Sequence, residues 1–235
     1  MKFNLAKAAV FAGASLMSAT AAAEFYVAGS YGIVDQDDSS NKGNFTSDFT
    51  TGTVTGVNPP LTIPAQSPVG WTTEFDRGDQ WTLALGWKLD NFRVELEYAS
   101  SASDVDTHKG VSAAGIDLTN IDAGVLISGN VGDLGVTVGE LVANGRGEIE
   151  TESFFLNGYY DFENESAFTP FVGVGIGTTT VDVEYAPSGV PVINDDDSGV
   201  SYQAIVGADY EITEALDVVL SIQYVMGDDA TVSSS

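Results

Sequence analysis

Charged side chains on one face of a short alternating stretch are the clearest candidates for chemistry in this sequence. In residues 92–99, apolar positions alternate with Arg93, Glu95 and Glu97. A charged side chain is costly in lipid, so this face must point to water or to a polar lumen. The sequence predicts ion pairs in such a lumen among the charged residues that share this parity in their own stretches: Lys88, Arg93, Glu95, Glu97, Asp209 and Asp217.

These six charges allow two interpretations. As the lining of a pore, their excess of acids over bases would make the path prefer cations. As an ion-pair plug, they would fill the lumen, and barrels of eight strands are normally filled by their own side chains. We favour the plug and keep the pore as the alternative.

His108 is the only histidine of the chain. Some barrel enzymes that modify lipid A use a His with a Ser at the outer rim, and such chemistry needs a hydroxyl within hydrogen-bond reach and an acid that orients the imidazole. Ser and Asp are too abundant around His108 to single out partners, and no G-x-S-x-G motif is present. We therefore expect a solvated loop histidine, no catalytic residue, no enzyme activity and no cofactor.

Two acidic runs could bind Ca²⁺, which takes carboxylate oxygens as ligands. They lie at Asp35 to Asp38 and at Asp195, Asp196 and Asp197. Neither run has the spacing of an EF-hand loop, and charge runs are usually solvated. The second run supplies the candidate metal ligands, and divalent cations held there could bridge to anionic lipopolysaccharide.

Composition excludes several classes of protein. The 235 residues include 34 acidic and 8 basic ones, a net charge of −26, and an acidic surface of this kind repels nucleic acid. No apolar run reaches the length of a membrane helix. The chain has no cysteine, so stability must come from strand pairing and packing without disulfides.

The first 23 residues have the pattern of a secretory signal peptide. Lys2 and Lys7 form a positive start, residues 8–18 a short apolar segment, and residues 21–23 a small-residue cleavage site before Glu24. We predict that residues 1–23 are cleaved and that residues 24–235 form the barrel domain. Loss of two lysines would leave six basic residues against 34 acidic ones, a net charge of −28.

Seven stretches with a period of two predict strands. Short and long connections alternate between them, so all tight turns fall at one end and the long loops, at about 35–78, 101–150 and 186–198, at the other. An outer-membrane barrel sorts its loops in this way. The fold class predicted is an all-β, antiparallel up-and-down transmembrane β-barrel of about eight strands, with the strands at 24–34, 79–89, 92–99, 151–162, 168–185, 202–211 and 216–226.

Glycines occupy one face of the predicted strand 168–185. Gly173, Gly175 and Gly177 alternate with apolar residues. Glycine weakens a strand unless something approaches its backbone closely. We interpret these positions as lumen-facing, leaving room for longer charged neighbours.

Several segments resemble a known family. They are LNGYYDF, PFVGVGIGTTTVDV, DDDSGVSYQAIVGADYEI and LDVVLSIQYVMGDD, and they are similar to the outer-membrane β-barrel family of bacterial surface antigens and opacity-type proteins. The resemblance implies an eight-stranded barrel in the bacterial outer membrane, with both termini in the periplasm and no catalytic residues. After Met226, however, the chain offers no eighth strand, so we expect the closing strand to be absent.

Three functions remain open from the sequence. The first is a monomeric outer-membrane protein with a structural, adhesion or surface-display role, whose partners are membrane lipid, lipopolysaccharide and divalent cations at the acidic loops. The second is a small porin-like channel for cations. The third, an exported soluble barrel that binds a ligand inside, would need apolar inward positions, and the charges at 93, 95 and 97 oppose it.

Overall fold

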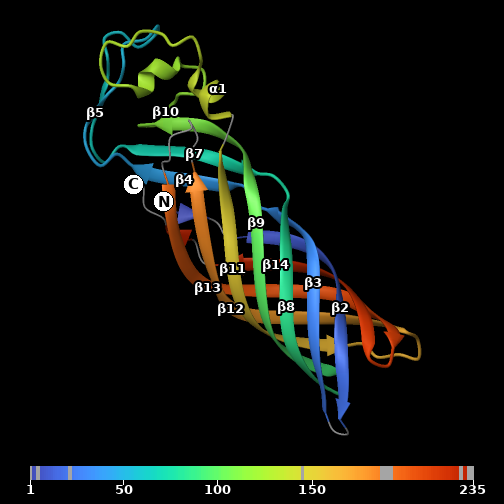
Figure 1. The fold of residues 1–235 in the computed structure, drawn as a ribbon. Coiled ribbons are helices and arrows are strands. Elements are labelled where there is room, and N and C mark those ends of the chain that lie inside the picture. The colour runs from blue at the N-terminus through green and yellow to red at the C-terminus, as the bar shows by residue number, and fades with distance from the viewer. Residues whose placement is uncertain are drawn as a thin grey trace.

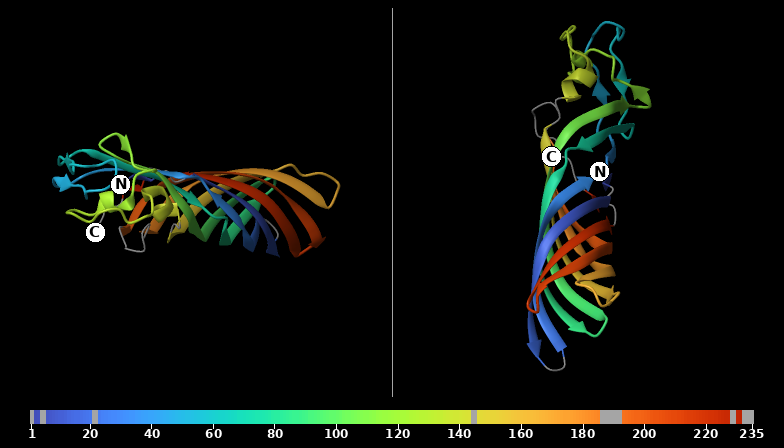
Figure 2. Two further views of the ribbon diagram at one scale, coloured as in Figure 1. Left: turned by 90° about the horizontal axis from the view of Figure 1, so that it is seen from above. Right: turned by 90° about the vertical axis from the view of Figure 1, so that its right-hand side faces the viewer.

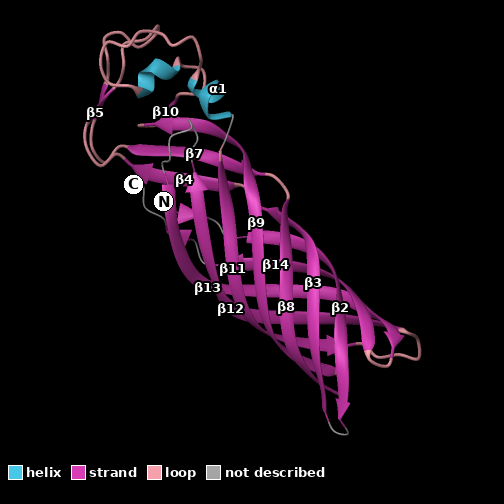
Figure 3. Cartoon of the chain, viewed as in Figure 1, coloured by secondary structure: helices cyan, strands magenta, loops and turns pink. Residues whose placement is uncertain are grey.

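The computed structural model describes residues 2–3, 6–20, 23–143, 146–185, 193–227 and 230–231. No helix in these ranges is long and apolar enough to cross a membrane. Strands dominate the chain, as Figure 3 shows.

Eight long strands pair in a closed antiparallel ring (Figure 1). Each strand pairs with its neighbour in order, and the pairing of β9 with β11 and of β2 with both β14 and β3 completes the circle. The prediction of an antiparallel β-barrel is therefore confirmed. The ring consists of β2 (Ala6–Thr20), β3 (Ala23–Gln36), β8 (Gly78–Leu89), β9 (Phe92–Ala113), β11 (Gly147–Asp161), β12 (Phe168–Tyr185), β13 (Ile193–Thr213) and β14 (Leu216–Gly227).

The outer surface of the ring is apolar. Leu85, Leu96 and Val174 are 62%, 63% and 69% exposed, while the residues on the other parity are buried. A soluble protein does not expose a continuous apolar belt of this kind, but a barrel in lipid requires one. The inside-out arrangement of a soluble ligand-binding barrel is therefore not present.

Aromatic rings mark both edges of the apolar belt. At the end with tight turns, called the turn end, Phe25 stacks on Trp87 with ring centroids 6.1 Å apart. At the opposite end, called the loop end, Tyr98 lies between Trp81 and Phe154, with centroids 5.2 Å and 4.9 Å away. Such girdles belong at the two membrane interfaces.

Strands also continue beyond the belt at the loop end, where the sequence predicted only loops. Residues 105–113 of β9 pair with β7 (Pro68–Phe75), which pairs with β4 (Ser39–Asn44), and β10 (Ile116–Asp117) adds to β9. We call this the distal sheet, and Figure 2 shows it rising above the barrel mouth. The predicted loops at 35–78 and 101–150 are thus partly wrong.

Two further differences concern loops. Within the predicted loop 101–150, residues 121–142 contain a 3₁₀ turn, η1 (Ala123–Leu126), and a short helix, α1 (Val138–Ala143). These pack over β5 (Phe49–Thr50) and β6 (Thr62–Ile63) around a small core of their own that includes Val54 and Val138. In the predicted loop 186–198, residues 186–192 lie outside the described residues, and 193–198 belong to β13.

The structure does not leave the gap that the sequence predicted between the first and last strands. Residues 6–20, which fall inside the predicted signal peptide, form β2 and occupy the eighth position. The short strands β1 (Lys2–Phe3) and β15 (Ala230–Thr231) pair with each other in a separate sheet. Removal of residues 1–23 on export stays a prediction.

Candidate functional sites in the lumen and at the loop end

Arg93 is the centre of a buried ion cluster at the turn end of the lumen. Its Nε donates to Asp161 Oδ1 at 2.9 Å, and its Nη2 lies 2.9 Å from Asp161 Oδ1 and 3.1 Å from Asp209 Oδ2. The guanidinium carbon is 5.0 Å from the ring centroid of Tyr159 and 4.6 Å from that of Phe171. One cation therefore holds two carboxylates and two aromatic faces together, which is a geometry that suits arginine better than lysine.

Lys88 extends the cluster toward the turn end. Its Nζ lies 3.6 Å from Asp161 Oδ2 and 3.2 Å from Glu163 Oε1. The sequence did not single out Asp161, although it lies on the same parity as the other inward residues of its strand. Extending the alternation of inward and outward residues to the last residue of this strand would have identified Asp161 as inward-facing.

A second polar layer lies above the Arg93 cluster. Glu95 accepts a hydrogen bond of 2.6 Å from the Tyr26 hydroxyl, and Glu97 accepts one of 3.1 Å from Gln203 Nε2. Lys7, near the loop end of β2, is buried and donates to Ser101 Oγ at 2.9 Å. The structure thus brings Arg93, Lys88 and Asp209 together and places Glu95 and Glu97 above them.

Asp217 also faces the lumen, from β14, and is 9% exposed. All six predicted ion-pair candidates therefore lie on the inner face of the barrel. Between the two polar layers, the cavity measures about 50 Å³. That volume holds one or two water molecules.

His108 is buried in the distal sheet and not solvated as the sequence predicted. Its Nδ1 lies 2.9 Å from the Thr73 hydroxyl, and its ring meets Tyr185 edge to face at 5.3 Å. Asn41 Nδ2 donates to the same Thr73 hydroxyl at 2.8 Å, so three strands share one polar chain. Burial lowers the pKa of His108, which favours the neutral imidazole.

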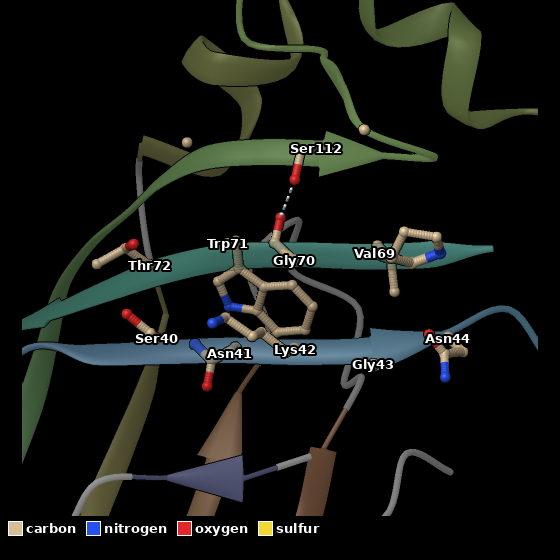
Figure 4. Close-up of a pocket in the computed structure, with 13 residues that line it drawn as sticks. Ser40, Asn41, Lys42, Gly43, Asn44, Val69, Gly70, Trp71, Thr72 and Ser112 are labelled. Carbon is tan, nitrogen blue, oxygen red and sulfur yellow. Dashed lines mark hydrogen bonds between the residues drawn. The ribbon is translucent and has the colours of Figure 1, made fainter. Parts of the chain in front are cut away.

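The opposite face of the distal sheet carries an open pocket of about 570 Å³ (Figure 4). Lys42, Gly70 and Ser112 lie across from one another there, because the first two pair between β4 and β7 and the last two between β7 and β9. Ser112 Oγ donates to the Gly70 carbonyl at 3.4 Å. Hydroxyl, amide and ammonium groups line this pocket, so it can hydrogen-bond a polar ligand. No pattern in the sequence marks its residues.

Carboxylates form a ladder on the outer face of the barrel, just beyond the aromatic girdle of the loop end. Glu148 is directly opposite Asp104 on one side and Glu184 on the other, and Asp182 is opposite both Glu150 and Asp196. Like charges in this relation destabilise a sheet. Partial burial and these neighbouring acids raise the pKa of Glu148.

The three candidate metal ligands do not lie on the same face of β13. Asp196 belongs to the ladder, while Asp195 and Asp197 lie on the other parity of β13. Asp35, from the first acidic run, lies 3.6 Å from Arg77 Nε at the surface. Among the described residues, no three acidic or histidine side chains are grouped as a metal site.

The closed ring, the apolar belt, the aromatic girdles and the sorted connections define a β-barrel of the bacterial outer membrane. The chain belongs to the Surface antigen family, which it matches over residues 73–229. It is also similar to the outer membrane protein PagN of Salmonella typhimurium, with 27% identity over 99 residues. That similarity covers 39% of this chain and 41% of PagN, so the chain spans about two fifths of that relative.

Among solved structures, a comparison with OpdQ of Pseudomonas aeruginosa covers 96% of this chain and 98% of that one, at 7% identity and a TM-score of 0.10. A likeness this low carries no argument. The family and the relative both place the chain in the bacterial outer membrane.

Proposed function

We propose that this protein is a non-enzymatic, monomeric surface protein that closes its own lumen and presents the distal sheet to the exterior. The observation that carries the proposal is the Arg93 cluster. A guanidinium held by Asp161 and Asp209, and flanked by two aromatic rings, occupies the turn end of the lumen. The cavity lined by Arg93, Glu95 and Glu97 measures about 50 Å³, which supports a lumen filled by the barrel's own side chains.

Conductance separates this proposal from the porin-like alternative. We expect the purified full-length barrel to give no stepwise current in planar lipid bilayers, because the side chains of the two polar layers occupy the lumen. A control with a general porin in the same bilayers shows that steps are detectable. Steady, cation-selective steps from the wild-type protein would establish the channel and remove the proposal of a closed lumen.

The distal pocket supports adhesion as the role of the displayed surface. Lys42 is exposed and has no ion-pair partner among the described residues, although the chain as a whole is strongly acidic. We propose that the pocket binds a polar, uncharged or weakly anionic ligand such as a saccharide.

Bacteria that display the protein should bind to glycan-coated surfaces, and Lys42→Glu should reduce that binding several-fold. The pocket loses its ammonium and gains a carboxylate in this variant. Asn120→Asp, elsewhere on an exposed loop, is the control for an added carboxylate outside the pocket. Equal binding by both variants at equal surface expression would exclude the pocket as the adhesive site.

Lipid, lipopolysaccharide and divalent cations are the partners we propose for the carboxylate ladder, which lies beyond the girdle at the height of the lipid headgroups. Mg²⁺ or Ca²⁺ there would be shared with lipid phosphates and not enclosed by the protein, since the described residues form no enclosed metal site. This arrangement relieves the repulsion between opposed carboxylates. Nucleic acid is not a proposed partner, because the surface is acidic.

Glu148→Gln should raise the free energy of unfolding by about 0.2–1 kcal/mol at low ionic strength, the usual size of a cross-strand pair effect. The pKa of Glu148 is raised in the folded protein. The ionised carboxylate therefore lowers the free energy of unfolding of the wild-type protein at neutral pH, and this loss disappears as the pH falls through that pKa. Urea unfolding in vesicles at two pH values and with added Mg²⁺ measures both effects. Glu165→Gln, in the turn at the far end, is the control and should change nothing.

A further inference from the structure

The tip of the loop end carries exposed apolar side chains that neither the lipid belt nor the distal pocket accounts for. We call residues 45–67 and 118–143 the cap, and Figures 1 and 2 show it beyond the distal sheet, at the end of the molecule opposite the tight turns. Apolar surface outside the membrane, rimmed by polar residues, marks an interaction site. The apolar side chains of the cap that are 37–50% exposed are Leu61, Leu126, Ile127, Val131 and Leu134.

Backbone hydrogen bonds hold the segments that carry these side chains next to one another. Thr51 N donates to the Leu61 carbonyl oxygen at 2.9 Å, and Gly52 N donates to the Val125 carbonyl oxygen at 3.3 Å. These two adjacent residues therefore lie between the segment of Leu61 and the segment 125–127. Two parts of the chain that are far apart in sequence thus present their apolar side chains at one tip.

Asp122 fixes the second half of this surface. Its Oδ1 accepts hydrogen bonds of 2.8 Å from Gly124 N and Leu134 N, and its Oδ2 accepts one of 2.8 Å from Gly135 N. A Cβ on Gly124 would lie only 2.5 Å from the Gly132 carbonyl oxygen, so the two segments are in close contact. The apolar side chains therefore stand on a packed support, and little ordering is needed when a partner binds.

Every charged residue of the cap is acidic. The cap contains no Lys or Arg, and its acids are Asp48, Asp122, Asp133 and Glu140. Asp133 lies between the exposed residues Val131 and Leu134, and its carboxylate accepts a hydrogen bond of 2.7 Å from Thr55 N. Like charges would repel each other in a contact between two caps or against an anionic membrane. The surface that complements the cap is therefore both apolar and basic.

We propose that the cap binds a protein segment whose apolar side chains are flanked by Lys or Arg. The apolar side chains of that segment cover the five exposed positions, and its basic side chains face Asp48 and Asp133. In such an interface the charges mainly raise the association rate, and burial of the apolar side chains supplies the affinity. The cap is separate from the distal pocket, where Lys42 provides the opposite charge.

Peptide binding to the full-length protein in nanodiscs of zwitterionic lipid tests the proposal. The probe is a fluorescent helical peptide of leucine and lysine with all leucines on one face, and two companion peptides carry serine for leucine or glutamate for lysine. We expect only the leucine–lysine peptide to bind above the level of empty nanodiscs, with a Kd that rises with salt. Equal binding of the serine peptide, or tighter binding of the glutamate peptide, overturns the proposal.

Variants place the binding on the cap. Ile127→Ser and, on a separate segment, Leu134→Ser should each raise the Kd of the leucine–lysine peptide by about tenfold or more, the usual loss for one buried aliphatic side chain. Ile116→Ser, a similarly exposed residue of β10 outside the cap, should leave the Kd unchanged. Asp133→Asn, which keeps an acceptor oxygen for Thr55, should raise the Kd several-fold at low salt and less at high salt.

Two results with these variants contradict the proposal. Equal effects of Ile127→Ser and Ile116→Ser on the Kd would show that the peptide does not bind at the cap. Association of wild-type nanodiscs with one another, abolished by Ile127→Ser, would identify a second copy of this chain as the partner in place of a basic segment.

Discussion

Replacing Arg93 by methionine should lower the free energy of unfolding by about 3–5 kcal/mol, the usual cost of removing one partner from a buried ion pair. Methionine keeps most of the side-chain volume but leaves Asp161 and Asp209 without their central cation. It also removes the contact of the guanidinium with Tyr159 and Phe171. Urea unfolding in lipid vesicles, followed by tryptophan fluorescence, measures the loss.

Two matched variants show whether the loss comes from uncompensated charge. Lys88→Met should cost no more than about 1 kcal/mol, because its side chain is partly exposed and exposed pairs contribute little. Arg93→Met combined with Asp161→Asn and Asp209→Asn should recover most of the stability, since an uncharged replacement of a whole buried ion cluster is often neutral. Equal losses for Lys88→Met and Arg93→Met would contradict the central role of Arg93.

Most of the barrel could be predicted from the sequence because lipid imposes a simple rule on each strand. Outward positions must be apolar, and inward positions can be polar. Residues 79–89 and 92–99 follow this rule strictly, and β8 and β9 contain both stretches. The same rule placed the charges at 93, 95 and 97 inside the lumen.

The distal sheet could not be predicted because the rule does not apply beyond the membrane. In residues 105–113 neither face meets lipid, so Asp106, His108 and Lys109 can stand in a strand without a clear alternation of apolar residues. Gly110, with a φ of 66°, adds a local irregularity to the pairing with β7. Burial of His108 depends on contacts with distant strands, and no local pattern carries that information.

Ion partners were predicted in part. The parity of each strand identified which charges face the lumen, but not their heights along the barrel axis. Heights depend on the register between strands, which brings Arg93 opposite Tyr159 and thus next to Asp161. The long-range pairing of β9 with β11 is therefore the missing information.

The lumen-facing glycines were correctly placed, but their neighbours were not the charged residues that we expected. A Cβ on Gly173 would meet the ring of Tyr159, one on Gly175 the amide of Asn157, and one on Gly177 the ring and backbone of the segment 154–155. Aromatic and amide side chains of β11 fill the space, and charged residues lie beyond them. The glycine face thus supports the rings that hold Arg93.

Gly173→Ala should lower the free energy of unfolding by about 1–3 kcal/mol, the usual cost of overpacking. Its Cβ would lie 2.4 Å from Tyr159 Cδ1. That ring has little freedom to move, because it packs edge to face against Phe171 at 5.7 Å and contacts the Arg93 guanidinium. Without the clash, alanine would stabilise the strand by restricting the unfolded chain. The clash with the Tyr159 ring therefore decides that Gly173→Ala lowers the free energy of unfolding.

Gly158→Ala is the matched control for Gly173→Ala. It lies on the outer face of β11, where nothing is within 4 Å of an added Cβ, so stability should stay equal or rise. In a Tyr159→Leu background, Gly173→Ala should lose most of its effect, because contacting residues couple in double-mutant cycles. If Gly173→Ala lowers the free energy of unfolding equally in both backgrounds, the glycine is needed for the backbone conformation of β12, and the Arg93 cluster does not depend on it.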